Sequence, residues 1–247
     1  DPYIIQNLKK FQINDDLTKL KNFRETIKKN PLNISRYWIQ SQKNLDVING
    51  NVAFLKTHNA LININNNEFT NSKLSLAIIY IVRDPRDVVL SYSKFRNLTL
   101  DVTINHMVSK NLVYVKNKDQ FSDIEIIGSW KFNYNSWKNG IPLIPRIIIK
   151  YEDLVDDSYN TFSRVISFLS KNIGCEIDLK KIKRSVRLSD FELLKNNEIE
   201  NSFSENRGTE NFFLTGKYNN WQNILNISQV KKLEENLKAE MTELKYI

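Results

Sequence analysis

The sequence predicts an α/β protein in which a parallel β-sheet is flanked by helices. Residues 74–82, LSLAIIYIV, form a near-continuous apolar run, which is typical of a strand covered on both faces in a parallel sheet. Residues 146–151, RIIIKY, form a second strand of the same kind. A segment with helical character follows each run, and such alternation favours a parallel sheet. We find no internal repeat and no long linker, so we expect a single domain over residues 1–247.

The first part of the chain is predicted to be mostly helical. Apolar residues recur at helical spacing in 15–29, and the aspartates at its start can cap the helix. A second helix is expected over 34–48, ending at an Asn-Gly pair. The short run VAFL, 52–55, predicts a buried strand, and the polar segment 59–73 predicts a loop.

The rest of the chain gives clearer helix signals. Asp84 is a good N-cap and Pro85 suits a first helical position, so a helix is expected to follow the strand at 74–82. Residues 156–172 predict an amphipathic helix that ends near Gly174. A loop is expected over 196–220. A last helix over 228–245 carries an apolar stripe of Val230, Leu233, Leu237, Met241 and Leu244.

Composition limits the classes of function. The net charge of +8 favours anionic partners, although the lysines are scattered along the chain. Cys175 is the only cysteine, so no internal disulfide can form, and one Cys with two His is too few for a structural zinc site. No apolar run approaches the roughly 20 residues that cross a bilayer, and no signal peptide opens the chain. We expect a cytoplasmic protein without a membrane span.

Arg83 stands at the exit of the first predicted strand, where ligands bind in parallel sheets. The helix that follows presents free N–H groups to an anion, and Ser91, eight residues after Arg83, can look back toward the strand exit. A guanidinium fork and a hydroxyl suit a phosphate. The alternative, equally compatible with the spacing, is that Arg83 pairs with Asp84 or Asp87 and that Ser91 is a helix-surface residue.

A second candidate site lies in FLKTHNAL, where Lys56 and His58 follow the run at 52–55. Alternate residues of an extended segment point to the same side, so these two side chains would share one space. Histidine is the usual general base near neutral pH. From the residues alone, a loop histidine with a structural hydrogen bond is the better-supported alternative. His106, on an expected helix, is not assigned a chemical role.

A third candidate is Tyr151, at the exit of the strand at 146–151. Its ring could stack on a ligand or its hydroxyl could bond one. The alternative is a tyrosine at the edge of the core, with Glu152 and Asp153 opening the next turn.

Taken together, these segments resemble the sulfotransferases that use 3′-phosphoadenosine 5′-phosphosulfate (PAPS). YIVRDPRDVVLSYSKF is similar to the family's 3′-phosphate-binding segment, LKTH to the segment with the catalytic histidine, and KYEDL to the strand-end motif near the adenine. LSDFELLKNN resembles the segment that places a hydroxyl and an aromatic ring at the adenine. GSWKFNYNSW and FFLTGKYNNWQNILN resemble a Gly-x-Trp stretch and the closing Gly-x-x-x-x-Trp region. The small, Asn- and Lys-rich form is similar to bacterial members.

The resemblance implies a sulfotransferase fold of the P-loop nucleotide kinase type. It also implies transfer of a sulfonate group from PAPS to a hydroxyl or amine, with PAP as the product and without a metal. His58 would act as the base and Lys56 would stabilise the sulfonate. The implied cofactor-binding residues are Arg83, Ser91, Tyr151, Ser189, Phe191, Arg207, Gly216 and Lys217. The implied acceptor is a small molecule or a carbohydrate, and no nucleic acid partner is expected.

Two departures from the family pattern stand out. No early strand is followed by the Lys-Ser/Thr-Gly loop that holds the 5′-phosphosulfate. The chain also starts without Met, so we expect the natural protein to carry about 25–40 more residues with this loop, and the chain alone to transfer sulfonate poorly. In the closing region, Leu214 stands where the family has a basic residue, a charge that Lys217 or Arg207 could replace.

Two alternatives to this function remain open. A non-catalytic protein of the same fold could bind an anionic partner such as a sulfated glycan or a nucleic acid, and both departures favour it. The pair Lys56 and His58 argues against it, because binding alone needs no base. A nucleotide or sugar kinase is disfavoured by the absence of a Walker-type loop and of an evident magnesium carboxylate.

Overall fold

The computed structural model of the chain describes residues 17–45, 52–109, 113–115, 124–201 and 216–247. Its contacts form two compact units. Unit 1 comprises Asp1–Ser75 and Ser109–Ile144, and unit 2 comprises Leu76–Val108 and Pro145–Ile247. Within the described ranges, none of the helices combines the length and the apolar character needed to span a bilayer.

Unit 1 combines short helices with two antiparallel strand pairs. Its helices are α2 (Leu17–Lys29), the 3₁₀ helix η1 (Pro31–Tyr37), α3 (Trp38–Lys43) and α6 (Trp130–Lys138). Strand β1 (Asn63–Ile64) pairs with β2 (Asn67–Glu68), and β4 (Val113–Val115) pairs with β5 (Ile124–Ile126). Aromatic rings hold the core together, because Phe69 makes edge contacts with Trp38 at 5.2 Å and with Trp137 at 5.9 Å between ring centroids.

Unit 1 corrects three predictions. The expected strand at 52–55 is wrong: these residues are not in a strand, and Phe54 is 64% exposed. A short apolar run becomes a buried strand only when a neighbouring strand pairs with it. The helix expected over 34–48 instead consists of η1 and α3, which ends at Lys43, and the part of it in 46–48 lies outside the described residues. The loop expected over 59–73 contains the β1–β2 hairpin, whose turn residues Asn65 and Asn66 have positive φ.

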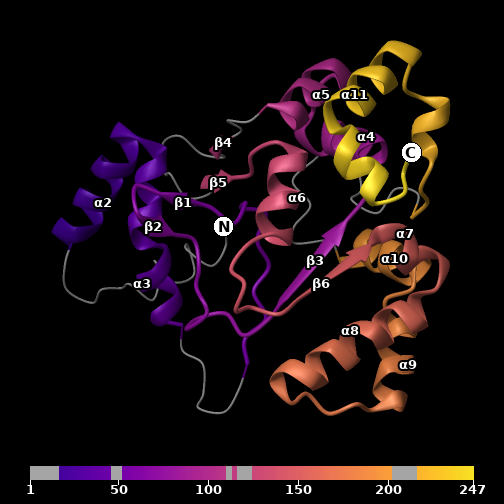
Figure 1. The fold of residues 1–247 in the computed structure, drawn as a ribbon, viewed down its shortest axis with the longest axis horizontal. Coiled ribbons are helices and arrows are strands. Elements are labelled where there is room, and N and C mark those ends of the chain that lie inside the picture. Colours follow the sequence, from indigo (N-terminus) through magenta and orange to yellow (C-terminus); the bar gives the residue numbers. More distant parts are fainter. Residues whose placement is uncertain (1–16, 46–51, 110–112, 116–123, 202–215) are drawn as a thin grey trace. The chain divides into compact units, whose positions relative to one another are not determined.

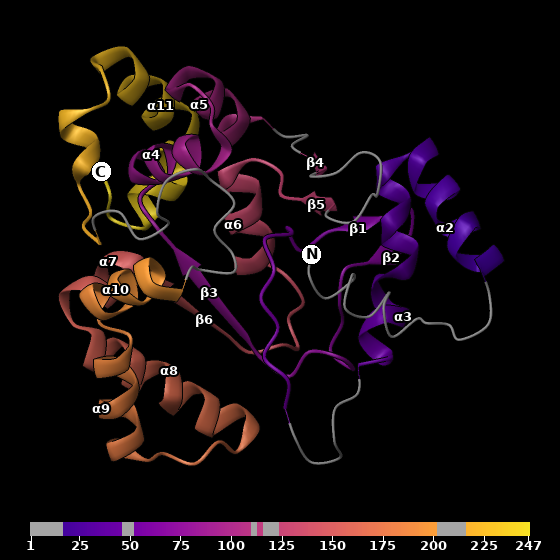
Figure 2. The same ribbon diagram turned by 180° about the vertical axis from the view of Figure 1, so that it is seen from behind.

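Unit 2 is built on the predicted parallel strands, β3 (Ile78–Val82) and β6 (Arg146–Lys150). They pair in register from Ile78 opposite Arg146 to Val82 opposite Lys150, and they run side by side in both ribbon views (Figures 1 and 2). Both strands therefore end at the same edge of the sheet. The prediction of an α/β fold with a parallel sheet flanked by helices is confirmed.

Among the residues that the structure describes, strand β3 is well covered on one face only, so the expectation of burial on both faces is wrong. Ile78 and Val82 are buried, whereas Ile79 and Ile81 on the other face are exposed. On that face, helix α8 (Ser158–Ile173) packs against Ile149 of β6 but leaves Ile81, its neighbour in register, 58% exposed.

Capping residues mark the start of one helix of unit 2 and the end of another. Asp84 caps α4 (Pro85–Arg96), accepting a hydrogen bond from the Arg86 N–H, as predicted. Gly174, with φ of 71°, ends α8, also as predicted. The remaining helices are α5 (Leu100–Val108), α7 (Tyr151–Asp156), α9 (Leu179–Leu188), α10 (Phe191–Asn201), η2 (Asn220–Asn223) and α11 (Ile227–Glu243).

The end of the chain matches the predicted last helix but not the whole of the predicted loop. Leu233, Leu237, Met241 and Leu244 of the apolar stripe are buried. Asn226 and Gln229 form a capping box at the start of α11. The loop expected over 196–220 is wrong at its beginning, because α10 extends through Asn201. Residues 202–215 lie outside the described residues.

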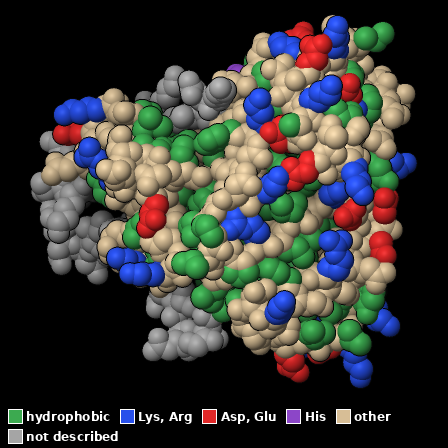
Figure 3. Space-filling model, viewed as in Figure 1, with side chains coloured by type: hydrophobic (Ala, Val, Ile, Leu, Met, Phe, Trp, Pro, Cys, Tyr) green, Lys and Arg blue, Asp and Glu red, His purple; other side chains and the backbone are tan. Residues whose placement is uncertain are grey.

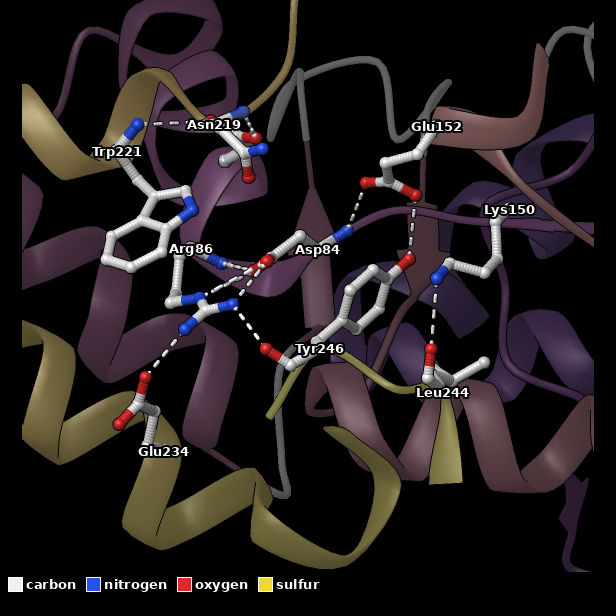
Figure 4. A network of polar contacts seen from close by, with 10 residues as sticks. Asp84, Arg86, Lys150, Glu152, Asn219, Trp221, Glu234, Leu244 and Tyr246 are labelled. Atoms are coloured by element: carbon white, nitrogen blue, oxygen red, sulfur yellow. Dashed lines mark hydrogen bonds and ion pairs between the residues drawn. The ribbon is translucent and has the colours of Figure 1, made fainter. Parts of the chain in front are cut away.

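Arg86 joins four parts of unit 2 (Figure 4). Its guanidinium is buried and lies 2.7 Å (Nη2 to Oδ2) from Asp84 and 2.6 Å (Nη1 to Oε1) from Glu234 of α11. Nη2 also donates to the carbonyl of Tyr246 at 2.9 Å, and the Trp221 ring centre lies 4.0 Å from Cζ. The residue therefore ties the start of α4 to α11, to η2 and to the C-terminal residues.

A second group of contacts extends this network to the end of β6. The carboxylate of Glu152 accepts from the Asp84 N–H at 3.0 Å and from the Tyr246 hydroxyl at 2.9 Å. Lys150 donates to the carbonyl of Leu244 at 3.0 Å. Burial, together with the nearby Glu152 carboxylate, raises the pKa of Tyr246 well above its usual range, so its hydroxyl stays protonated and remains a donor.

Replacing Arg86 should destabilise the protein more than any exposed charge does. Arg86→Met keeps most of the packing but leaves buried Asp84 without its cation, which typically costs about 3–5 kcal/mol. Urea unfolding would measure this cost. Lys94→Met, an exposed change on the same helix, should shift the free energy of unfolding by no more than about 0.5 kcal/mol.

The double variant Arg86→Met/Asp84→Asn tests the cause of this loss. Asparagine still caps a helix but needs no counter-ion. The double variant should therefore lose clearly less free energy of unfolding than the two single variants lose together. Strictly additive losses would show that the Asp84–Arg86 ion pair does not account for the effect.

Candidate active site

Arg83 and Tyr151, predicted from two strand exits, lie together in unit 2. Each directly follows the last paired residue of its strand, Val82 in β3 and Lys150 in β6. The guanidinium carbon of Arg83 lies 4.4 Å from the centre of the Tyr151 ring, and Nη2 donates to the carbonyl of Lys217 at 3.0 Å. The sheet register thus brings Arg83 and Tyr151 together, and Lys217 joins them from a later segment of the chain.

The guanidinium of Arg83 keeps donor capacity. Its Nε is buried and has no hydrogen-bond partner among the described residues. The alternative pairing with Asp84 or Asp87 does not occur in this part of the chain, because Asp84 binds Arg86. Asp87 instead accepts from the backbone N–H groups of Asn219 at 2.6 Å and Trp221 at 3.2 Å. A cation with an unused buried donor beside an aromatic ring fits a phosphate next to a base.

Ser91 is not brought into contact with Arg83. It lies exposed on α4, and its hydroxyl donates to the carbonyl of Val88 in its own helix at 3.1 Å. Such a bond satisfies the hydroxyl locally but leaves its oxygen lone pairs available. A shared phosphate site of Arg83 and Ser91 therefore stays a prediction.

Phe191 and Gly216 form the neighbouring part of the candidate site. Gly216 has φ of +60°, and a Cβ there would lie 2.5 Å from the Phe191 ring, so only glycine allows this approach. Lys217, the next residue, contacts Arg83 through its carbonyl while its side chain stays exposed. Ser189, the C-cap of α9, is also exposed. Arg207 and Leu214 lie outside the described residues.

His58, in unit 1, makes a contact that local sequence patterns do not predict. Its Nδ1 lies 2.9 Å from Oε1 of Glu125 in β5, and because a carboxylate only accepts, the ring donates from Nδ1. This leaves Nε2 as the unprotonated nitrogen of the neutral ring. The His58 side chain is 58% exposed, whereas that of Glu125 is only 17% exposed. The one sequence signal for Glu125 is a carboxylate between two apolar residues of a short strand.

The backbone around His58 is fixed by its neighbour Asn59. The buried Asn59 accepts from the Ile126 N–H at 2.7 Å through its side chain and from the Trp137 ring N–H at 2.9 Å through its carbonyl. Asn133 of α6 donates to the His58 carbonyl at 3.1 Å. Lys56 is exposed, two residues before His58. Among the described residues, no group of three His, Cys, Asp or Glu side chains could hold a metal ion.

Comparison with known proteins adds the family context. A model of the sulfotransferase domain matches residues 12–245. The amine sulfotransferase of Oryctolagus cuniculus is 24% identical over 183 residues, covering 69% of this chain and 56% of that protein. Sulfotransferase 2A6 of Mus musculus is 25% identical over 206 residues, covering 80% of this chain and 67% of that protein.

Solved structures share the fold. Mouse sulfotransferase SULT7A1 complexed with PAP has 21% identity and a TM-score of 0.50, covering 67% of this chain and 58% of that one. Retinol dehydratase with androsterone and the inactive cofactor PAP has 21% identity and a TM-score of 0.54, covering 92% and 66%. The chain spans between 56% and 67% of the length of these four proteins. The match of the domain model to nearly the whole chain shows that it belongs to the sulfotransferase family.

Proposed function

We propose that the protein transfers a sulfonate group from PAPS to a hydroxyl or amine acceptor. One observation carries this proposal: Arg83, with a buried donor unused, stacks on Tyr151 at the shared end of two parallel strands. A cation and an aromatic ring in contact suit the 3′-phosphate and the adenine of a single nucleotide. Family membership and the fold shared with PAP-bound structures support the same nucleotide.

In this proposal, the residues of unit 2 bind the nucleotide. Arg83 and Ser91 hold the 3′-phosphate, and Tyr151, Ser189 and Phe191 frame the adenine. Gly216 lets the chain pass close to Phe191, and Lys217 places its carbonyl on Arg83. Lys217 or Arg207 supplies the positive charge that the family has where this chain has Leu214. Fixed donors of this kind stabilise charge without reorganisation.

The residues around His58 perform the proton transfer. Glu125 holds the proton on Nδ1, so Nε2 can accept the proton of the acceptor hydroxyl or amine. As that proton leaves, the acceptor oxygen or nitrogen bonds to sulfur, and the bond from sulfur to the 5′-phosphate oxygen breaks. PAPS supplies the activated sulfonate and leaves as PAP. Lys56 stabilises negative charge on the sulfonate in transfer.

The acceptor is proposed to be a small molecule or a carbohydrate. The retinol dehydratase structure holds androsterone, a small molecule with a hydroxyl group, and relatives include an amine sulfotransferase. These names support a small-molecule acceptor with a hydroxyl or an amine group. The proposed location is the cytoplasm, and no nucleic acid partner is proposed.

A non-catalytic, anion-binding protein of this fold is the second candidate, and Leu214 in place of a basic residue favours it. Calorimetric titration with 3′,5′-ADP, 5′-AMP and ATP, together with an assay of radiolabelled sulfonate transfer, separates the candidates. The enzyme binds 3′,5′-ADP selectively, and it transfers label efficiently in a form that carries the 5′-phosphosulfate loop. A binding protein transfers none, and a kinase prefers ATP.

Loss of Arg83 should weaken binding of 3′,5′-ADP. Hydrogen bonds to charged groups contribute about 1.5–3 kcal/mol, so Arg83→Ala should raise the dissociation constant by roughly 10- to 150-fold. Lys94→Ala, which removes an exposed charge from α4, is the matched control and should change it little. If the unaltered protein binds 3′,5′-ADP and 5′-AMP equally well in calorimetry, Arg83 is not a 3′-phosphate ligand.

In a form of the protein that carries the 5′-phosphosulfate loop, loss of His58 should remove most turnover and leave binding intact. His58→Ala deletes a general base, which typically contributes about 10²–10⁴-fold, while the exposed side chain contributes little to packing. Affinity for 3′,5′-ADP and the melting temperature should stay nearly unchanged. A large fall in melting temperature with turnover retained would mean that His58 has a structural role.

Glu125 should act by fixing the tautomer of His58. Glu125→Gln lets an amide N–H donate to Nδ1 and so favours the tautomer in which Nε2 carries the proton and cannot act as a base. We expect kcat to fall with KM nearly unchanged. Nitrogen-15 NMR reads the tautomer directly, and the chain has only two histidines, so His106→Gln completes the assignment. An unchanged His58 tautomer with a lowered kcat would contradict this role.

A further inference from the structure

Helix α9 carries an unusual concentration of positive charge. Five of its ten residues are basic, none is acidic, and all five basic side chains are exposed. They are Lys180, Lys181, Lys183, Arg184 and Arg187. The helix packs against α8 and buries Ile182, so most of its circumference is open to solvent.

Little of this charge is neutralised by ion pairs within the part of the protein that the structure describes. Lys181 lies 3.7 Å from the Asp178 carboxylate, in an exposed pair, whereas the other four form no ion pair with any residue that the structure describes. The aspartates at the two ends of α9 already cap helices. Asp178 accepts a hydrogen bond from the backbone of α9, and Asp190 accepts one from the backbone of α10. Like charges one turn apart repel each other, so the cluster opposes folding of α9.

Exposed aliphatic side chains border the basic cluster. Leu179 is 59% exposed and Leu188 is 53% exposed, and Ile177, just before the helix, is 48% exposed. At 3.6 residues per turn the five basic residues occupy an arc of about 160°, with Leu179 and Leu188 near its two ends. On the face of the molecule shown in Figure 3, basic, acidic and hydrophobic side chains are interspersed.

We propose that the exposed face of α9 docks the protein on an anionic lipid bilayer. Lipid headgroups attract the basic side chains, and the interfacial region accepts Leu179 and Leu188, which flank the basic arc on opposite sides of the helix. A nucleic acid or a sulfated glycan would satisfy the charges but offers no apolar layer for the leucines. The aliphatic side chains therefore favour the bilayer over a soluble polyanion. In this arrangement α9 lies on the membrane surface and does not cross the bilayer.

The direct test is sedimentation of the whole chain with vesicles of phosphatidylcholine, with and without phosphatidylserine. We expect binding only where phosphatidylserine is present, and binding that weakens as salt is added. Each basic residue near an anionic surface contributes roughly a fivefold factor, so removing four should reduce partitioning more than 100-fold. Equal binding to both vesicle types, or to neither, would overturn the proposal.

Matched variants separate α9 from net charge. The variant K180Q/K183Q/R184Q/R187Q removes four charges from α9, and K28Q/K29Q/K231Q/K238Q removes four exposed charges from other helices. The first should lose vesicle binding and the second should keep most of it. Equal losses would show that net charge alone is responsible. Circular dichroism and melting temperature confirm that both variants fold.

A second pair of measurements tests the choice of lipid. L179S/L188S keeps every charge, and we expect it to bind phosphatidylserine vesicles at least tenfold more weakly, because each exposed leucine contributes apolar contact. Unchanged binding would remove the reason for choosing a bilayer. Tight binding to heparin or single-stranded RNA, without binding to vesicles, would assign the face to a soluble polyanion instead.

Discussion

The buried ion pair between Asp84 and Arg86 is the interaction on which the arrangement of unit 2 depends. Asp84 caps α4 and binds Arg86, and Arg86 then reaches Glu234 of α11 and the carbonyl of Tyr246. A buried cation needs this number of partners, because its desolvation is repaid only by several good hydrogen bonds. The start of α4, and with it the exit of β3, is therefore fixed by the C-terminal part of the chain.

The sheet register places the residues of the proposed nucleotide site next to this fixed point. Val82 pairs with Lys150, so the residues that follow, Arg83 and Tyr151, emerge side by side at one edge. Two similar motifs along the chain, each a strand ending in a polar residue, thus become one stacked pair. Gly216 and Lys217 then close on Phe191 and Arg83 from a third part of the chain.

The sequence correctly predicted the features that depend on interactions between residues close together in the chain. The cap at Asp84, the αL end at Gly174 and the stripe of α11 each depend on residues a few positions apart. The apolar run at 52–55 was misread, because burial depends on a pairing partner that the run itself does not specify. Arg86 and Glu125 escaped detection for the same reason: Arg86 meets Tyr246 160 residues away, and His58 meets Glu125 67 residues away.

The carboxylates beside Arg83 explain why it remains available to an anion. Asp84 and Asp87 stand one and four residues after it, close enough in sequence to neutralise it. Asp84 is held by Arg86, and Asp87 accepts from two backbone N–H groups of the segment that also carries Lys217. Each carboxylate has other partners, and neither forms an ion pair with the Arg83 guanidinium in the described part of the chain. The interactions that stabilise unit 2 therefore also keep a cation with an unused donor at the end of its sheet.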